Sequence, residues 1–180
     1  MNKRRRYTIV MSIVAIGLLA AVWFSFQKNV LAPVSRPGVP GILAGMKLRS
    51  VTEGEEAMAR VNQLHGTGIE LSDAFIAEYS YDFNAYQTNN DHVTVWVGEA
   101  ESGEAAKQLT ERMIRGIEKG TSVFGKPELI TTAGQEVYQV RGPGGEHFFY
   151  ISKKNAKQVI WAIISSNNPS TFLNAIVAGF

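Results

Sequence analysis

The longest uninterrupted run of apolar residues lies near the N-terminus, from Tyr7 to Phe26. It contains no charged residue and no proline, and as a helix rising 1.5 Å per residue it would span about 30 Å, the thickness of the hydrocarbon core of a bilayer. Tyr7 at one end and Trp23, Phe24 and Phe26 at the other match the aromatic belts of a membrane helix. The pattern predicts a transmembrane helix over residues 7–26.

Four basic residues precede this run and set its expected direction. They are Lys3, Arg4, Arg5 and Arg6. Basic residues stay on the cytoplasmic side of a membrane helix, so residues 1–6 are expected to form a cytoplasmic tail. The sequence thus predicts a single-pass signal-anchor protein of the bacterial cell membrane, with its C-terminal domain extracytoplasmic. The alternative is a cleaved signal peptide and a secreted protein, but the apolar run is longer than the 7–15 residues typical of signal peptides.

Residues 27–46 show neither helical nor alternating periodicity. Prolines and glycines interrupt the segment at short intervals, which is typical of an extended spacer. These residues are Pro33, Pro37, Pro40, Gly38, Gly41 and Gly45. We expect a Pro/Gly-rich linker over residues 27–46, followed by a globular domain over residues 47–180.

Three segments of the domain have helical spacing of apolar residues. The first begins at Thr52, which forms a capping-box pattern with Glu55, and ends at Gly66. The second covers residues 103–118 with Ser102 as N-cap, and the third begins at Asn168, where a proline follows the cap.

Six segments have the composition or the alternation of β-strands. They are residues 74–79, 92–98, 127–131, 135–141, 146–152 and 157–164. The loops between the last four are short, which makes neighbouring strands antiparallel. The expected fold class is therefore α+β: one antiparallel sheet with about three helices packed on it, all on the same face.

Charge and cysteine content exclude several classes of function. The chain has no cysteine, which excludes disulfides, thiolate nucleophiles and Cys-ligated zinc. The net charge is +2, but five of the 18 basic residues and none of the 16 acidic ones lie within residues 1–28. Residues 29–180 therefore carry 13 basic and 16 acidic residues, a net charge of −3. A domain without a basic face is not expected to bind nucleic acid.

No motif for catalysis, metal binding or cofactor binding emerges from the spacing of polar residues. His65, His92 and His147 are too far apart for a helical metal motif. Residues 141–145 (RGPGG) resemble a phosphate-binding loop in composition, but they join two predicted strands and are better interpreted as a hairpin turn. The acidic residues Glu99, Glu101 and Glu104 match the preference of carboxylates for a helix N-terminus. We expect no catalytic residue, no metal and no cofactor.

Aromatic residues on three of the predicted strands form the one candidate ligand or partner surface. Trp96, His147, Phe149 and Trp161 would share a groove if their strands were neighbours. Packing of the same side chains in the core is the simpler alternative.

The sequence therefore predicts a membrane-anchored, extracytoplasmic binding or interaction module that is not an enzyme. The expected partners are the membrane and a protein of the envelope, with the chain serving as accessory subunit of a cell-envelope complex. The alternatives are an envelope hydrolase that uses carboxylates with His147, and a secreted protein released by cleavage.

Overall fold

A computed structural model describes residues 34–65, 70–82, 91–120 and 123–180. Residues Val34–Phe180 form one compact unit. Among the described residues, no helix is long and apolar enough to cross a bilayer. The predicted membrane helix at residues 7–26 lies outside the described part, as do the basic residues Lys3 to Arg6.

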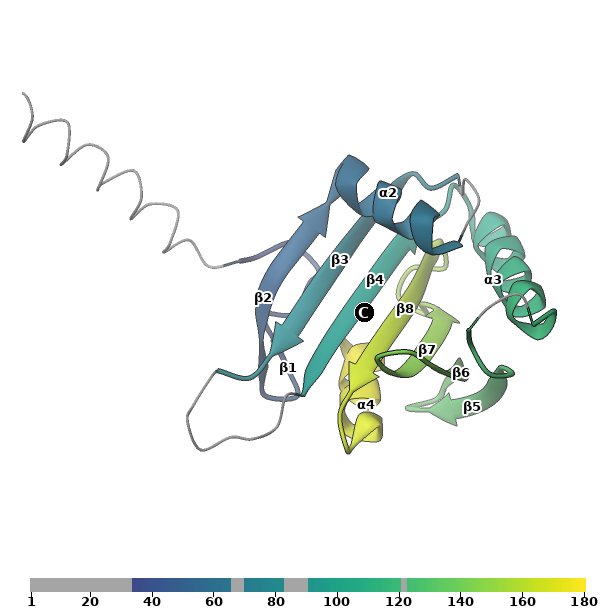
Figure 1. Cartoon of the computed structure of the whole chain (residues 1–180). Coiled ribbons are helices and arrows are strands. Elements are labelled where there is room, and N and C mark those ends of the chain that lie inside the picture. Colours follow the sequence, from purple (N-terminus) through teal and green to yellow (C-terminus); the bar gives the residue numbers. More distant parts are fainter. Residues whose placement is uncertain (1–33, 66–69, 83–90, 121–122) are drawn as a thin grey trace, which may run out of the picture. The chain divides into compact units, whose positions relative to one another are not determined.

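An eight-stranded antiparallel sheet organises the compact unit (Figure 1). The strands follow the order β1-β2-β3-β4-β8-β7-β6-β5 across the sheet. Their bounds are β1 Ile42–Leu43, β2 Met46–Glu53, β3 Asp73–Ser80, β4 His92–Glu99, β5 Glu128–Thr132, β6 Gln135–Gly142, β7 Gly145–Ile151 and β8 Gln158–Ser165. The first four strands and the last four each form a consecutive meander, and the two meanders join where β4 pairs with β8.

Within the described part of the chain, three helices accompany the sheet: α2 at Gly54–His65, α3 at Gly103–Glu118 and α4 at Pro169–Gly179. The predicted α+β class, with one antiparallel sheet and three helices, is therefore confirmed. The prediction of α3 holds to the residue, since Ser102 caps it by accepting a hydrogen bond from the backbone N–H of Ala105 at 3.1 Å. The segment 141–145 is part of the tight hairpin between β6 and β7, as expected.

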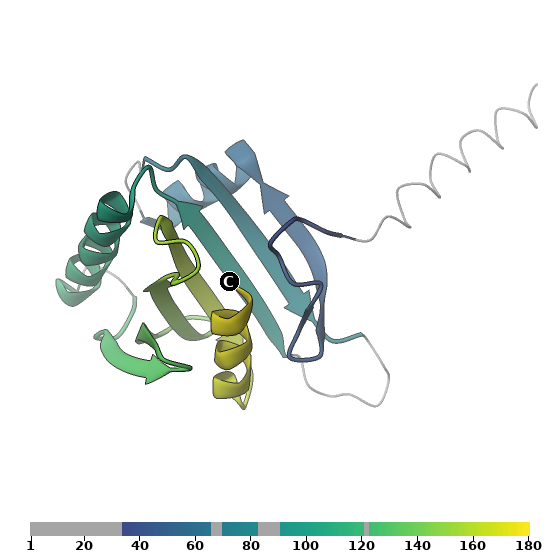
Figure 2. The same ribbon diagram turned by 180° about the vertical axis from the view of Figure 1, so that it is seen from behind.

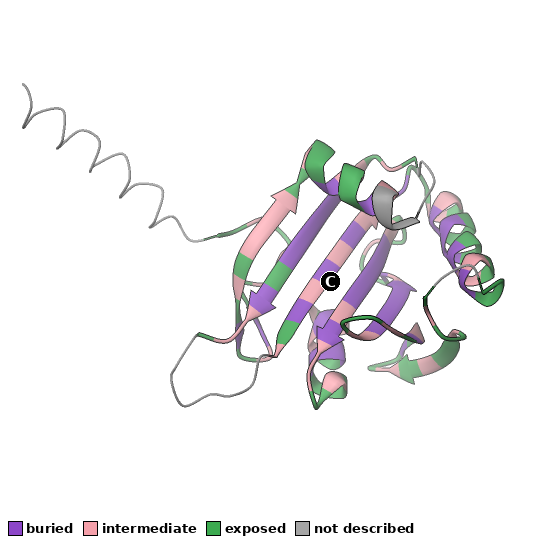
Figure 3. Ribbon diagram, in the orientation of Figure 1, coloured by how far each residue is buried: buried purple, intermediate pink, exposed green. Residues whose placement is uncertain are grey.

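The helices cover both faces of the sheet, so the expectation that all lie on one face is wrong. α2 and α3 lie on one face (Figure 1), and α4 covers the other together with residues 34–45 (Figure 2). Strands buried on both faces read as continuous apolar runs instead of alternating ones. β3 and β8 show such runs, with four consecutive buried residues each at 74–77 and 159–162 (Figure 3).

The segment expected to be a linker is folded into the compact unit from Val34 onward. Leu43 and Met46 are buried in the same core cluster as α4. The hydroxyl of Tyr79 donates a hydrogen bond to the carbonyl of Pro40 at 2.9 Å, which fixes the segment across the sheet. Proline and glycine here shape a strap that packs on the domain instead of a free spacer.

Arg36, near the beginning of this strap, contacts the end of β2 and the start of β3. Its guanidinium group lies 2.5 Å from Asp73 and 3.3 Å from Glu53, and it stacks 4.3 Å above the ring of Phe75. Phe75 in turn contacts the ring of Phe180, with 6.3 Å between the centroids. The strap and the C-terminal residue thus pack together on this face of the sheet.

The start of the first helix also differs from the sequence prediction. Thr52 lies in β2, and α2 begins at Gly54, whose φ of +63° turns the chain out of the strand. Such a backbone angle favours glycine because it has no Cβ. The strand itself escaped prediction because its residues, MKLRSVTE, are mostly polar and a register shift between Leu48 and Ser50 breaks the alternation.

Candidate functional site

One row of side chains crosses the face of the sheet that carries α2 and α3. The strand register aligns Trp96 of β4 with Trp161 of β8, Trp161 with Phe149 of β7, and Phe149 with Tyr138 of β6. The row ends on β5 at Leu129, the partner of Tyr138. Residues directly opposite on neighbouring antiparallel strands share a face, so all five lie side by side on it.

The central rings of this row stack on one another. The rings of Phe149 and Trp161 are nearly parallel, with an angle of 7° between their planes and 5.2 Å between their centroids. Tyr138 lies at 17° and 5.1 Å from Phe149 on its other side. Offset stacking at these distances adds to the stabilisation from burial alone, by about 0.5–1.5 kcal/mol for each pair.

His147 lies beside the row, two residues before Phe149 in β7 and therefore on the same face. The indole N–H of Trp161 donates to Nδ1 of His147 at 3.2 Å, so Nδ1 carries the lone pair. The proton of the neutral ring is then on Nε2, which donates to the carbonyl of Pro143 at 2.8 Å. Both ring nitrogens are therefore engaged, and the contacts select one neutral tautomer.

The ring of Phe124 packs against both His147 and Trp161. It meets His147 edge to face at 4.9 Å and Trp161 at 5.4 Å between centroids. The absence of a side chain at Gly142 makes room for it, since a Cβ there would lie 2.2 Å from the Phe124 ring. The RGPGG turn thus binds His147 through the Pro143 carbonyl, and the lack of a side chain at Gly142 leaves space for the Phe124 ring.

The structure brings together all four residues of the candidate surface that the sequence suggested, and it buries three of them. Phe149, His147 and Trp161 are 0%, 3% and 6% exposed, whereas Trp96 is half-buried. This arrangement favours the alternative of core packing for those three residues. Trp96 differs from Trp161 in a second respect: its buried indole N–H has no acceptor among the described residues.

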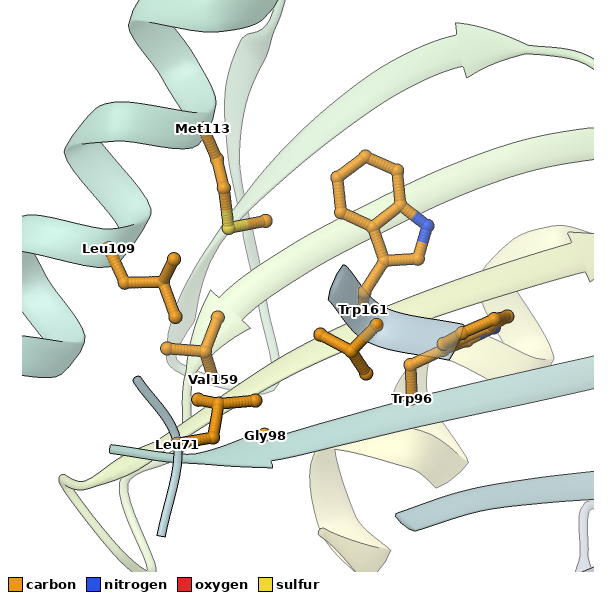
Figure 4. A pocket seen from close by; sticks show the side chains of 8 residues that line it. Leu71, Trp96, Gly98, Leu109, Met113, Val159 and Trp161 are labelled. Carbon is orange, nitrogen blue, oxygen red and sulfur yellow. The ribbon is translucent and has the colours of Figure 1, made fainter. Parts of the chain in front are cut away.

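A small apolar crevice opens beside Trp96, between α2 and α3 (Figure 4). Its volume is about 20 Å³, which is room for a single water molecule and far below the volume of a typical ligand pocket. It is lined by Val61, Leu71, Trp96, Gly98, Leu109, Met113, Val159 and Trp161. The sequence pointed to the two tryptophans but not to the crevice, because no local pattern shows that α2 and α3 become neighbours beside Trp96.

The acidic residues Glu99, Glu101 and Glu104 lie near the start of α3, as the sequence suggested. Glu99 accepts hydrogen bonds from the side-chain amides of Asn155 at 3.4 Å and Gln158 at 3.2 Å. Glu101 and Glu104 are exposed around the start of α3, where the helix dipole favours them. Among the described residues, no group of three or more His, Cys, Asp or Glu side chains is arranged to hold a metal ion.

Comparison of the chain with protein-family models, with curated proteins and with solved structures gives no match.

The two tryptophans give a matched pair of substitutions. Trp161→Phe removes the indole donor and leaves buried Nδ1 of His147 without its partner, whereas Trp96→Phe removes an N–H that has no acceptor in the described part of the chain. An unsatisfied buried polar group costs about 1–3 kcal/mol. Trp161→Phe should therefore lower the free energy of unfolding by about 1–3 kcal/mol more than Trp96→Phe, as measured by urea denaturation. Equal losses would show that the Trp161–His147 hydrogen bond contributes nothing.

The burial of His147 predicts a loss of stability in mild acid. Desolvation by burial lowers the pKa of His147 below its usual value. Protonation of Nδ1 would also set a second N–H against the indole N–H of Trp161. The unfolded chain binds the proton below about pH 6.5 and the folded chain resists it, so stability is full above that pH and falls below it.

The measurement is urea denaturation at pH 7.5 and pH 5.0. One group can contribute at most about 1.4 kcal/mol for each pH unit between its two pKa values. The control is His147→Gln, which cannot titrate and should show a smaller difference between the two pH values. An unchanged difference in this variant would assign the acid sensitivity to another group.

Proposed function

We propose that the chain is a membrane-anchored, extracytoplasmic interaction module that binds a protein partner and serves as accessory subunit of a cell-envelope complex. The uncharged run Tyr7–Phe26 and the four basic residues before it support the anchor and its direction. The partner site is the crevice between α2 and α3.

The length of the connecting chain supports a role close to the membrane. The predicted span ends at Phe26 and the compact unit begins at Val34, so residues 27–33 alone join them. Seven fully extended residues reach at most about 25 Å. A domain on so short a tether meets partners at the membrane surface and cannot sample distant ones, which suits a subunit of a membrane-bound assembly.

The apolar crevice is the observation that carries the proposal. It is lined almost entirely by carbon and sulfur atoms, and three of its residues, Leu71, Trp96 and Gly98, are half-buried and so reachable from solvent. Its small volume does not suit a cofactor or a metabolite, which fill several hundred cubic ångströms. The tip of a protruding aliphatic side chain of a protein partner, about one methyl group, matches this volume better, and protein interfaces are centred on such apolar anchors.

The contacts of His147 give no reason to extend the proposal to a hydrolase. A general base needs a nitrogen within reach of the substrate. One ring nitrogen of His147 accepts from Trp161 and the other donates to Pro143, and the ring is 3% exposed.

Photo-crosslinking at the crevice tests the proposal. A diazirine-bearing amino acid replaces Met113, a crevice residue, in the full-length chain expressed in its native membrane. The matched control places the same group at Lys107, whose side chain is 68% exposed on the same helix. The proposal predicts a discrete adduct with one envelope protein from position 113 and none from position 107.

Two results would contradict it. One is the absence of a protein adduct at position 113, and the other is the same adducts at both positions, which would reflect collision. The intact mass of the recovered chain distinguishes an anchored protein, which retains residues 1–33, from a secreted one.

A further inference from the structure

The two edges of the sheet differ in how well they are protected. β1 closes one edge with only two residues, Ile42 and Leu43. β5 closes the other with five residues, Glu128–Thr132, and has no partner strand on its outer side among the described residues. An unpaired edge presents backbone N–H and C=O groups that can pair with another strand.

β5 lacks most of the features that usually prevent such pairing, although its first residue, Glu128, is charged. Its register with β6 is continuous from Glu128 to Thr132, without a bulge, and neither proline nor lysine occurs within it. Leu129 at its centre is 54% exposed. Proteins commonly blunt a free edge with a bulge, a proline or an inward lysine, so an edge without them is suited to accept a strand.

The turn after β5 determines which of its backbone groups face outward. The two turn residues, Ala133 and Gly134, both have positive φ, at 47° and 73°, which is the geometry of a type I′ turn. In such a hairpin the flanking residues, Thr132 and Gln135, form a hydrogen-bonded pair, and bonded and non-bonded pairs then alternate along the strands. The N–H and C=O groups of Leu129 and Thr131 therefore point away from β6.

We propose that β5 pairs antiparallel with β5 of a second copy of this chain, with Ile130 facing Ile130 across the twofold axis. In this register Leu129 of each copy faces Thr131 of the other, so every outward N–H and C=O group of these two residues finds a partner. Ile130 then occupies a closely spaced, non-hydrogen-bonded position, where β-branched pairs pack well.

The charges and the symmetry of β5 favour a second copy over an unrelated strand. The proposed register puts Glu128 opposite Thr132, so no like charges meet, and it leaves Pro127, which lacks an N–H, opposite Ala133 beyond the paired residues. The same patch faces itself about a twofold axis, the commonest symmetry of protein assemblies.

The size of the contact indicates where pairing occurs. A five-residue edge buries less than the 1,200 Å² of a stable interface, so two copies would associate weakly in solution. Confinement of anchored chains to one membrane raises their effective concentration, as a linker does for joined domains. The increase in effective concentration rests on the proposed anchor, whereas the edge pairing rests on β5 alone.

Disulfide trapping of the full-length chain in lipid vesicles tests the pairing, and the natural chain has no cysteine that could interfere. Ile130→Cys places two thiols at a non-hydrogen-bonded pair, where the Cα atoms lie about 4.5 Å apart, within disulfide range. Leu129→Cys is the control. In the proposed register the two introduced cysteines are offset by two residues along the strands, so their Cα atoms would lie about 8 Å apart, too far for a disulfide. Mild oxidation should give a covalent dimer from Ile130→Cys and much less from Leu129→Cys.

A second pair of variants separates edge pairing from chance collision. Thr131→Pro, in the Ile130→Cys chain, removes an outward N–H and no hydrogen bond to β6. It should reduce dimer yield by roughly fivefold or more, and Thr131→Ala should leave the yield within roughly twofold. The proposal is overturned by no dimer from Ile130→Cys, by an equal yield from Leu129→Cys, or by no effect of Thr131→Pro. Dimer formation without any adduct at position 113 would uphold this inference and reject the heterologous partner.

Discussion

The pairing of β4 with β8 is the contact on which the rest of the structure depends. Each four-stranded meander is consecutive in sequence, and this pair alone joins the two into one sheet. All eight residues of β4 have a partner on β8, from His92 with Ser165 to Glu99 with Gln158. At its centre Trp96 faces Trp161, so both halves contribute an indole to the same row. The crevice follows from this seam, because Val61 of α2 and Leu109 and Met113 of α3 line it beside the paired tryptophans.

Burial on both faces explains why the aromatic residues near the seam are poor candidates for an open binding surface. Val93, Val95 and Val97 project from β4 toward α4, whereas Trp96 projects toward α2 and α3. β8 divides its side chains in the same way, with Ile160 on the first face. A partner can therefore reach the aromatic row at two places: the crevice beside Trp96, and the far end at Leu129, which no helix among the described elements covers. The proposed partner contact uses the first opening, and the proposed strand pairing runs along the β5 edge that carries the second.

Elements with strong local signals could be predicted from the sequence. α3 has a polar cap at Ser102 and a regular apolar stripe, and the structure reproduces its limits to the residue. β2 lacked a signal because its polar residues and the register shift at Leu48 hide the alternation. The placement of helices on both faces was visible in part, since the consecutive buried residues 159–162 of β8 are typical of a strand covered twice. The crevice depends on which helices become neighbours, and no local pattern encodes that.

Native-state hydrogen exchange on the full-length chain in detergent micelles tests the central role of the seam most directly. Amides buried in the last structure to unfold exchange only through global unfolding. We expect the amides of Val95 and Ala162, which face each other across the seam, to exchange with the free energy of global unfolding, as do those of β7. If β4 and its meander exchanged through a lower-energy opening while β5 to β8 remained protected, the two halves would be independent folding units and the seam would not hold the structure together.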